Sequence, residues 1–396
     1  MDILAQQYRR HFPILETACY MISNSLGAMP KEAKAELDVY TKLWEFSGVE
    51  AWHQWFPLVN EVSSLFANII GANSEDVVLI HNLTIANAII ASSLDFSGQR
   101  NKVVYTDLHF PSISYVWQGW QKYGARPVVI QSEDGITIDP EKICAAIDET
   151  TLIVPISHVY FRSGALQDVR SIIDRAHQMG ALVILDSYQA AGVVPIDVKA
   201  LDIDILMSGV LKWLCGGPGA AFMYVRQNLQ EQFQPAIRGW LADREPFAFN
   251  MPDVNFTLGM HRFLTSSIQV PCLYTARSGL KIITEVGVEA IRKKSLELTD
   301  RIIALADEFG FTVNTPRDPV KRGGAITVNY INGSTEDSSR ITQKICEHLI
   351  ARRFIVDYRP PLGIRIAPHF YNTLDEVEAV MLEMRLLKEK LMYHDD

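Results

Sequence analysis

The stretch Ala181-Leu-Val-Ile-Leu-Asp186 is a run of five apolar residues followed directly by a carboxylate. A short, continuous apolar run is typical of a strand that is buried on both faces, as in a parallel sheet covered by helices. Similar runs occur at 152–156 and 205–207, and a helical stretch at 168–179 precedes this strand. The alternation predicts an α/β fold with a mostly parallel sheet. Functional side chains should then lie at the carboxyl ends of strands.

The same alternation extends along the chain and then changes after about residue 270. In the first part we expect further strands and helices at 103–105, 114–122, 127–130, 139–147 and 220–225. In the second part, where a long helix is interrupted near Gly287, we expect elements at 278–309, 325–330, 354–356 and 374–391. The change predicts an N-terminal segment (1–30), a large domain of helices flanking the sheet (31–270) and a smaller α+β domain (271–396).

The composition limits the kinds of protein this chain can be. It has 396 residues, 48% of them hydrophobic and 21% charged, with a net charge of −9, which favours a packed protein over a disordered or nucleic-acid-binding one. No apolar run reaches about 18 residues and residues 1–10 lack an apolar core, so we expect neither a membrane span nor a secretory signal. The five cysteines are scattered and the ten histidines show no HExxH or HxxxH spacing. We therefore expect a cytoplasmic protein without a metal site.

Two charged residues follow strands of the predicted sheet. Asp186 ends its strand, where a half-desolvated carboxylate needs a cationic partner. Lys212 lies in Ser208-Gly-Val-Leu-Lys-Trp-Leu-Cys-Gly-Gly-Pro-Gly219, a glycine-rich loop that directly follows another strand. A lysine held close to a sheet loses solvent and can become the neutral nucleophile that forms a Schiff base. Upstream, Asn82-Leu-Thr84 opens a helical run, and a helix N-terminus with a hydroxyl group can seat a phosphate.

Each of these features alone has an ordinary structural explanation. Lys212 could be a solvated surface lysine, Asp186 a turn cap and Thr84 an N-cap. Together, a phosphate seat, a buried acid and a Schiff-base lysine are the three groups that pyridoxal 5′-phosphate requires, because the acid keeps the pyridine nitrogen protonated and makes the ring an electron sink. The combination therefore predicts a pyridoxal-phosphate-dependent enzyme.

Several longer segments also give the chain a family likeness. They are residues 157–164, 181–197, 212–219, 239–249 and 354–373. With them the sequence resembles the class V aminotransferase superfamily of fold-type-I pyridoxal-phosphate enzymes, and within it kynureninase most closely, over roughly residues 20–390. The resemblance implies a fold-type-I architecture, an α-amino acid as the substrate and a homodimer with shared active sites.

The resemblance further implies which residues bind the cofactor. Lys212 would form the internal aldimine, Asp186 would pair with the ring nitrogen, and Ser157 would hydrogen-bond near the phenolic oxygen. Phe110 would stack on the ring, with His109 as the alternative, because cysteine desulfurases stack a histidine near this position. The other implied cofactor contacts are Leu83 and Thr84 at the phosphate, Gln189 where kynureninase has histidine, and Trp240 and Ser267 at the phosphate of the neighbouring subunit.

The resemblance assigns the substrate to two other parts of the chain. Arg365 would clamp the α-carboxylate through a bidentate pair, and a structural salt bridge is the alternative role for this arginine. Asn24 and Ser25 resemble an N-terminal loop that closes over the substrate, although they could equally form a plain turn.

The sequence departs from kynureninase where that family has polar groups around the cofactor and the aryl pocket. Leu211 replaces a phosphate-binding tyrosine, Ile113 replaces an aspartate, and Ala242-Asp243 replaces a Gly-His pair. Each change removes a polar group from that environment.

Four functions are compatible with this pattern to different degrees. The leading hypothesis is a kynureninase-like hydrolase or lyase that cleaves a bond at Cβ through aldimine and quinonoid intermediates. An aminotransferase has the same groups but would use Lys212 to move a proton between Cα and the cofactor's C4′ carbon. A cysteine desulfurase is less favoured, since residues 351–370 contain no cysteine and Cys346 lies in an expected helix. A binding protein without chemistry is disfavoured because Lys212 and Asp186 are both present.

Overall fold

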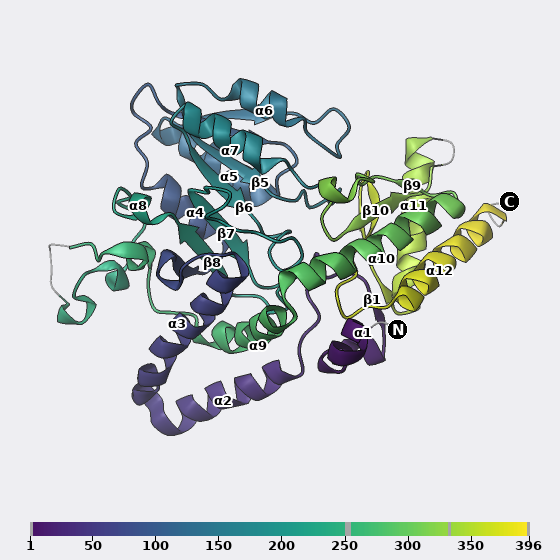
Figure 1. Cartoon of the computed structure of the whole chain (residues 1–396), viewed down its shortest axis with the longest axis horizontal. Helices are drawn as coiled ribbons and strands as arrows, with labels where there is room; N and C mark the ends of the chain where they lie inside the picture. Colours follow the sequence, from purple (N-terminus) through teal and green to yellow (C-terminus); the bar gives the residue numbers. More distant parts are fainter. Residues whose placement is uncertain (1–2, 250–254, 332–333, 394–396) are drawn as a thin grey trace.

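A computed structural model describes residues 3–249, 255–331 and 334–393. Figure 1 shows a broad sheet with helices packed around it and a smaller unit of helices and strands beside it. The consecutive helices α9 (Val270–Val286) and α10 (Val288–Glu308) run from one part to the other. Gly287, with a φ of +80°, separates them, which confirms the predicted interruption. The first of the two helices begins at Val270, earlier than the predicted residue 278.

Within the described residues the large sheet has seven strands and is mostly parallel. In spatial order they are β2 (Val77–Ile80), β8 (Ala221–Val225), β7 (Ile205–Gly209), β6 (Leu182–Asp186), β5 (Thr151–Ser157), β3 (Lys102–Thr106) and β4 (Arg126–Ile130). β8 runs antiparallel to both neighbours, and the other pairs are parallel. The loop between β7 and β8 is too short for the crossover that a parallel return requires, so β8 must reverse direction.

Helices cover both faces of this sheet, as the continuous apolar strands predicted. α4 (Leu83–Ala91) and α5 (Pro111–Gly119) share one hydrophobic cluster with the strands. α3 (Trp52–Ile69), α6 (Pro140–Ala146) and α7 (Val169–Gln178) share the cluster on the other face. The carboxyl ends of β5, β6 and β7 are left facing the small unit and the N-terminal loop.

The small unit is built on a second, antiparallel sheet. Its strands in spatial order are β12 (Asp357–Arg359), β13 (Gly363–Ile366), β10 (Ile326–Asn329) and β9 (Thr312–Val313). Its core is shared with α10, α11 (Thr335–Ala351) and α12 (Leu374–Tyr393). The predicted strand at 354–356 forms β11 (Phe354–Ile355), but it pairs in parallel with β1 (Cys19–Tyr20) instead of joining this sheet. That pairing ties the N-terminal segment to the small unit.

Several elements have no counterpart in the sequence prediction. The largest is α3, which packs with α2 (Glu32–Ser47) against α9. The edge strand β2 was also not anticipated, because its four apolar residues are too few to separate a strand from a helix by periodicity. The short helices α1 (Ile3–Tyr8) and α8 (Gln227–Gln230) also have no predicted counterpart.

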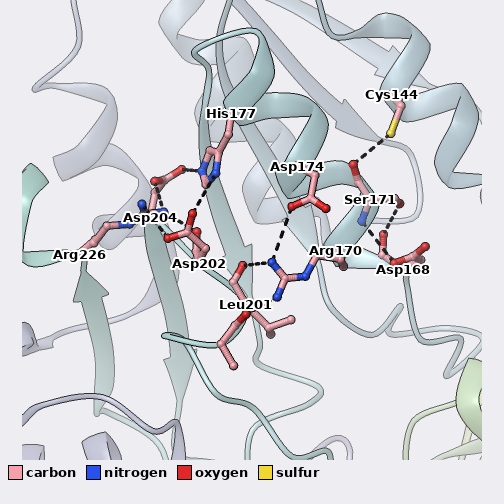
Figure 2. A network of polar contacts seen from close by, with 11 residues as sticks. Cys144, Asp168, Arg170, Ser171, Asp174, His177, Leu201, Asp202, Asp204 and Arg226 are labelled. Carbon is pink, nitrogen blue, oxygen red and sulfur yellow. Dashed lines mark hydrogen bonds and ion pairs between the residues drawn. The ribbon is translucent and has the colours of Figure 1, made fainter.

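A polar network fastens the amino ends of β6 and β7, on the side of the sheet away from their carboxyl ends (Figure 2). Asp204 is 3% exposed and accepts a hydrogen bond from the backbone N–H of Val183 at 2.8 Å. Its carboxylate also lies 2.9 Å from Nε2 of His177 and 2.8 Å from Nη2 of Arg226. The more exposed Asp202 contacts the same two side chains. The network joins α7, β6 and the end of β8, and so fixes the sheet that carries the site.

Candidate active site

A cavity of about 610 Å³ opens at the carboxyl ends of β5, β6 and β7. The first turn of α4, the loop after β7, the N-terminal loop and the turn between β12 and β13 complete its wall. All but two of the residues predicted to serve the site line this cavity. They are Asn24, Ser25, Leu83, Thr84, Phe110, Ser157, Asp186, Gln189, Lys212 and Arg365.

The register of the sheet determines where Asp186 lies. Ser157 and Asp186 are paired partners at the ends of the adjacent parallel strands β5 and β6, so both reach the same edge. Asp186 is 7% exposed, and its Oδ1 accepts a hydrogen bond from the backbone N–H of Tyr188 at 2.9 Å. Burial raises the pKa of the Asp186 carboxyl above its ordinary value, against the opposing effects of that hydrogen bond and the charge of Lys212.

Lys212 stands on the loop that connects β7 and β8. Its Nζ lies 4.3 Å from the centroid of the Tyr188 ring and 5.8 Å from that of Phe110. The Tyr188 ring can occupy this place because residue 209 is glycine, and a Cβ there would come within 1.8 Å of the ring. Burial lowers the pKa of the Lys212 amine, and Arg365 and Arg359 lower it further, while Asp186 opposes them. The amine is therefore more easily deprotonated than an ordinary lysine.

The first turn of α4 faces the same cavity. Asn82 is its N-cap, with the side chain accepting a hydrogen bond from the backbone N–H of Ile85 at 2.9 Å. The capping role considered for Thr84 is thus taken by Asn82, which leaves the Thr84 hydroxyl on the cavity wall. The first N–H groups of a helix lack intrahelical partners and favour an anion. This turn is suited to a phosphate.

Phe110 and His109, the two candidates for ring stacking, occupy different environments. Phe110 lines the cavity and is 49% exposed. His109 is 4% exposed and lies behind Ser157, with Nδ1 2.7 Å from the Ser157 Oγ. Burial lowers the pKa of His109 to about 3, so its imidazole is neutral at physiological pH. Only Phe110 of this pair presents a ring to the cavity.

Arg365 both lines the cavity and takes part in a structural ion pair. Its Nε donates to Oδ1 of Asp357 at 2.7 Å and its Nη2 contacts the second carboxylate oxygen, while Nη1 donates to the carbonyl oxygen of Phe161 at 2.6 Å. Arg359 contacts the same Asp357 carboxylate at 2.8 Å. The guanidinium of Arg365 is thus held at all three nitrogens, and the residue lines the cavity.

The N-terminal loop is attached to the loop that carries Lys212 and to the small unit. The backbone N–H of Gly27 donates to the carbonyl oxygen of Leu211 at 2.7 Å, and Ser23 Oγ lies 2.8 Å from the Tyr371 hydroxyl. Asn24 is 1% exposed, and neither polar atom of its side chain has a hydrogen-bond partner among the described residues. A buried amide without partners on a cavity wall is suited to a polar ligand.

Trp240 and Ser267, both predicted to contact cofactor phosphate, lie away from this cavity. Trp240 packs against Phe247 and Phe249, with ring centroids 5.4 and 6.0 Å apart. Ser267 lines a separate small recess beside the end of β2. A single chain therefore does not bring these two residues to its own site.

The cavity also contains residues that the sequence analysis did not name as parts of the site. Tyr188 and Arg162 lie just beyond the carboxyl ends of β6 and β5. The rule that functional groups follow strand ends could have found both of them.

The arrangement fits pyridoxal phosphate. The cavity volume is within the range of small-molecule sites. A desolvated lysine, a strand-end acid and a helix N-terminus meet there, and the unpartnered amide of Asn24 lies on the wall. Together with a mostly parallel sheet flanked by helices, these features define the class as a fold-type-I pyridoxal-phosphate-dependent enzyme. Among the described residues no cluster of side chains is suited to a metal ion, and no helix is long and apolar enough to span a membrane.

The chain belongs to the class V aminotransferase family, whose model matches residues 45–380. It is 30% identical to a protein from Bacillus subtilis called uncharacterized aminotransferase YcbU, over 97% of this chain and 98% of that protein. It is 28% identical to a kynureninase from Geobacillus thermodenitrificans, over 98% of this chain and 92% of the relative. Family membership confirms the predicted dependence on pyridoxal phosphate.

Solved structures share the same fold. A cysteine desulfurase from Thermococcus onnurineus matches with a TM-score of 0.84 at 21% identity, over 97% of this chain and 98% of that one. A mutant of C-DES, with glycine covalently linked to its pyridoxal-phosphate cofactor, matches with a TM-score of 0.85 at 16% identity, over 95% and 98% of the two chains. These likenesses confirm the predicted fold class.

Proposed function

We propose that this enzyme acts on an α-amino acid and cleaves a bond at its Cβ, as a kynureninase-like hydrolase or lyase. The observation that carries the proposal is that Lys212, Asp186 and Arg365 line one cavity. Several relatives named kynureninase, at 28–29% identity, match over nearly the whole chain, which supports this reaction class.

In this proposal, different residues contact different parts of the cofactor. Leu83 and Thr84 would bind the phosphate, Phe110 would cover one face of the ring, and Ser157 and Gln189 would contact its polar edge. When bound, pyridoxal phosphate supplies an electron sink for charge that develops at the substrate's Cα. Asp186 would hold the ring nitrogen, and its Oδ2 has no hydrogen-bond partner among the described residues.

Lys212 is the proposed nucleophile and proton carrier. An amine with a lowered pKa is partly neutral near neutral pH, so Nζ can attack a carbonyl carbon and later accept or return a proton. Its place against the rings of Tyr188 and Phe110 excludes water from one side and limits the directions in which Nζ can move.

Arg365 is proposed to bind the substrate's α-carboxylate. Asp357 and the Phe161 carbonyl hold its guanidinium in a fixed plane, which supports an orienting role. Asn24 and Ser25 are proposed to contact the substrate from the N-terminal loop, and the unpartnered amide of Asn24 supports this.

We also propose that the active species is a homodimer in the cytoplasm. Exposed aromatic side chains at Trp240, Phe247 and Phe249 lie outside the chain's own cavity, and a second copy could cover them. In that dimer Trp240 and Ser267 would reach the phosphate of the neighbouring site. All five cysteines are free, which suits a reducing compartment.

An aminotransferase is the second candidate, favoured by the relative from Bacillus subtilis that is named an aminotransferase and is 30% identical over 97% of this chain. One feature of the cavity argues against kynurenine itself as the substrate. Ile113 and Leu211, which stand where kynureninase has polar residues, both line the wall as apolar side chains. An apolar wall at these positions supports a substrate other than kynurenine.

Product analysis tests the proposal. The loaded enzyme would be incubated with kynurenine, cysteine derivatives, alanine and glutamate, with and without a keto-acid acceptor. Cleavage at Cβ should yield alanine, or pyruvate and ammonia, without an acceptor. Products that form only when a keto acid is present, with transfer of the amino group to it, would contradict cleavage and favour the aminotransferase.

A further inference from the structure

The charged side chains that line the cavity are unbalanced. Four are cationic, namely Arg162, Lys212, Arg359 and Arg365, whereas Asp186 is the only acidic residue among the described lining residues. The proposed reaction uses Lys212 and Asp186 together. Of the three arginines, only Arg365 has a proposed role, the binding of the α-carboxylate, and Arg359 and Arg162 remain to be explained.

Two of these arginines share one carboxylate. Asp357 contacts Nε of Arg365 at 2.7 Å through Oδ1 and Nη2 of Arg359 at 2.8 Å through Oδ2. Two guanidinium groups around a single carboxylate leave one net positive charge. That charge is sufficient for one incoming anion, the α-carboxylate of an amino acid.

Arg162 is left without such a partner. No acidic side chain in the described parts of the chain pairs with it, and its guanidinium lies 5.3 Å from the centroid of the neighbouring Phe161 ring. Many exposed arginines on protein surfaces are simply solvated. Arg162 differs from these because its side chain lies on the wall of a cavity that takes a small molecule.

The backbone of Arg162 is fixed beside Arg365. The carbonyl oxygen of Phe161 accepts a hydrogen bond from Nη1 of Arg365 at 2.6 Å, and the carbonyl oxygen of Arg162 accepts one from Thr327 Oγ1 at 2.6 Å. A rigid backbone with an unpaired guanidinium next to the proposed α-carboxylate site is the arrangement expected for recognising a second anion on the same molecule.

We infer that Arg162 binds a second anionic group, so that the substrate class is an α-amino acid with an acidic side chain, such as a dicarboxylic amino acid. The inference rests on the proposed function, since it names the substrate class for that same site. Arg365 and Arg162 would hold the two ends of the substrate. The apolar side chains of Val159 and Phe161 would cover the carbons between them.

The test compares two acidic amino acids with their own amides, which have the same length but no side-chain charge. Binding of aspartate, asparagine, glutamate and glutamine to the loaded enzyme would be titrated through the visible spectrum of the cofactor. At least one acid should bind about tenfold or more tighter than its amide, as expected for a charge-assisted bond. Arg162→Gln should abolish that preference and leave amide affinity within about twofold, whereas Arg162→Lys should restore part of it.

A matched control separates this effect from the general loss of a surface arginine. Arg385 on α12 also lies over a phenyl ring, that of Phe309, at 5.1 Å, but it does not line the cavity. Arg385→Gln should leave the preference unchanged.

Three outcomes would overturn the inference. Equal affinity for acid and amide would show that the cavity has no second anion site. An equal loss of affinity for acid and amide in Arg162→Gln would assign Arg162 to the α-carboxylate. A loss of affinity for the cofactor would assign it to the phosphate. Failure of all four amino acids to bind, or binding without charge preference, would overturn this inference alone, whereas the proposed function fails only if the product analysis detects no cleavage at Cβ of any amino acid.

Discussion

Lys212 and Asp186 carry opposite charges in one cavity, yet no hydrogen bond joins them in the described structure. Asp186 is buried and Lys212 is half-buried, and burial moves their pKa values toward each other, with that of the lysine lowered and that of the acid raised. This separation leaves room for a ligand to reach both groups. At the residue scale, the altered pKa values of Lys212 and Asp186 therefore arise mainly from burial and not from a direct ion pair between them.

Lys212→Ala should abolish the covalent link to the cofactor and reduce turnover by about 10³-fold or more, because it removes both the nucleophile and the proton carrier. Borohydride reduction followed by mass spectrometry would measure the link. Lys199→Ala, at an exposed lysine that hydrogen-bonds Asn73, is the control and should behave as wild type. A covalent link that survives in Lys212→Ala would assign the nucleophile to another residue.

Arg365→Lys should lower kcat/KM by a factor that corresponds to about 1.5–3 kcal/mol of activation free energy, because an ammonium cannot make the planar two-bond contact to a carboxylate. Steady-state kinetics would give the change. Arg359→Lys, which alters the second, more exposed partner of Asp357, should have a smaller effect. If the Arg359 variant loses more, the α-carboxylate binds at Arg359 and Arg365 is structural.

At the scale of elements, the parallel strands β5, β6 and β7 have their candidate functional residues at the carboxyl ends. The polar network around Asp204 lies at the amino ends of β6 and β7 (Figure 2). Asp204 holds β6 through the N–H of Val183 and holds α7 through His177. Stability and chemistry thus reside at opposite edges of the same strands, so each can be altered separately.

Asp204→Asn should reduce the free energy of unfolding by about 3–5 kcal/mol, because it leaves the partners of a buried carboxylate uncompensated. Urea denaturation would measure the loss. Asp202→Asn is the matched control: its side chain contacts the same His177 and Arg226 but is 57% exposed, and it should lose less than about 1 kcal/mol. Equal losses for the two variants would argue against burial as the cause.

At the scale of the whole molecule, three histidines of the described residues are buried and have lowered pKa values. Burial lowers the pKa of His109 to about 3 and those of His158 and His369 to about 4. Below pH about 6.5 the unfolded chain binds a proton at each imidazole, whereas the folded chain does not until pH 3–4. These groups therefore stabilise the fold fully above pH 6.5 and progressively less as the pH falls.

Each such histidine should reduce the free energy of unfolding by about 1.4 kcal/mol per pH unit between pH 6 and 4. His158→Gln should remove one of the three contributions, so the free energy of unfolding, measured by urea denaturation at each pH, should fall less steeply by that amount. His53→Gln, at an exposed histidine of α3, should leave the dependence unchanged. An unaltered dependence in His158→Gln would mean that His158 is protonated in the folded chain.

Assembly gives a second prediction at this scale. If Ser267 serves the neighbouring site, mixing a Lys212→Ala chain with a Ser267→Trp chain should recover about a quarter of the wild-type activity, because half of randomly paired dimers contain one intact site. Activity after proven subunit exchange would be the measurement. An active monomer in light scattering, or exchanged hybrids without recovered activity, would rule out a shared site.

The sequence by itself determined the parts of this protein that depend on local pattern. The buried strands, the break at Gly287, the acid after β6 and the lysine after β7 could all be predicted, because apolar periodicity and strand-end position are properties of short segments. Motif likeness added the family and the cofactor.

Only the tertiary structure decided which of those residues meet and which of their partners are occupied. It set Phe110 on the cavity and His109 behind Ser157, attached Arg365 to Asp357, and kept Trp240 and Ser267 away from the chain's own cavity. It also gave Arg162 no acidic partner among the described residues. The physical reason is that pairing, burial and pKa depend on contacts between segments far apart in the chain, and local periodicity contains no information about those contacts.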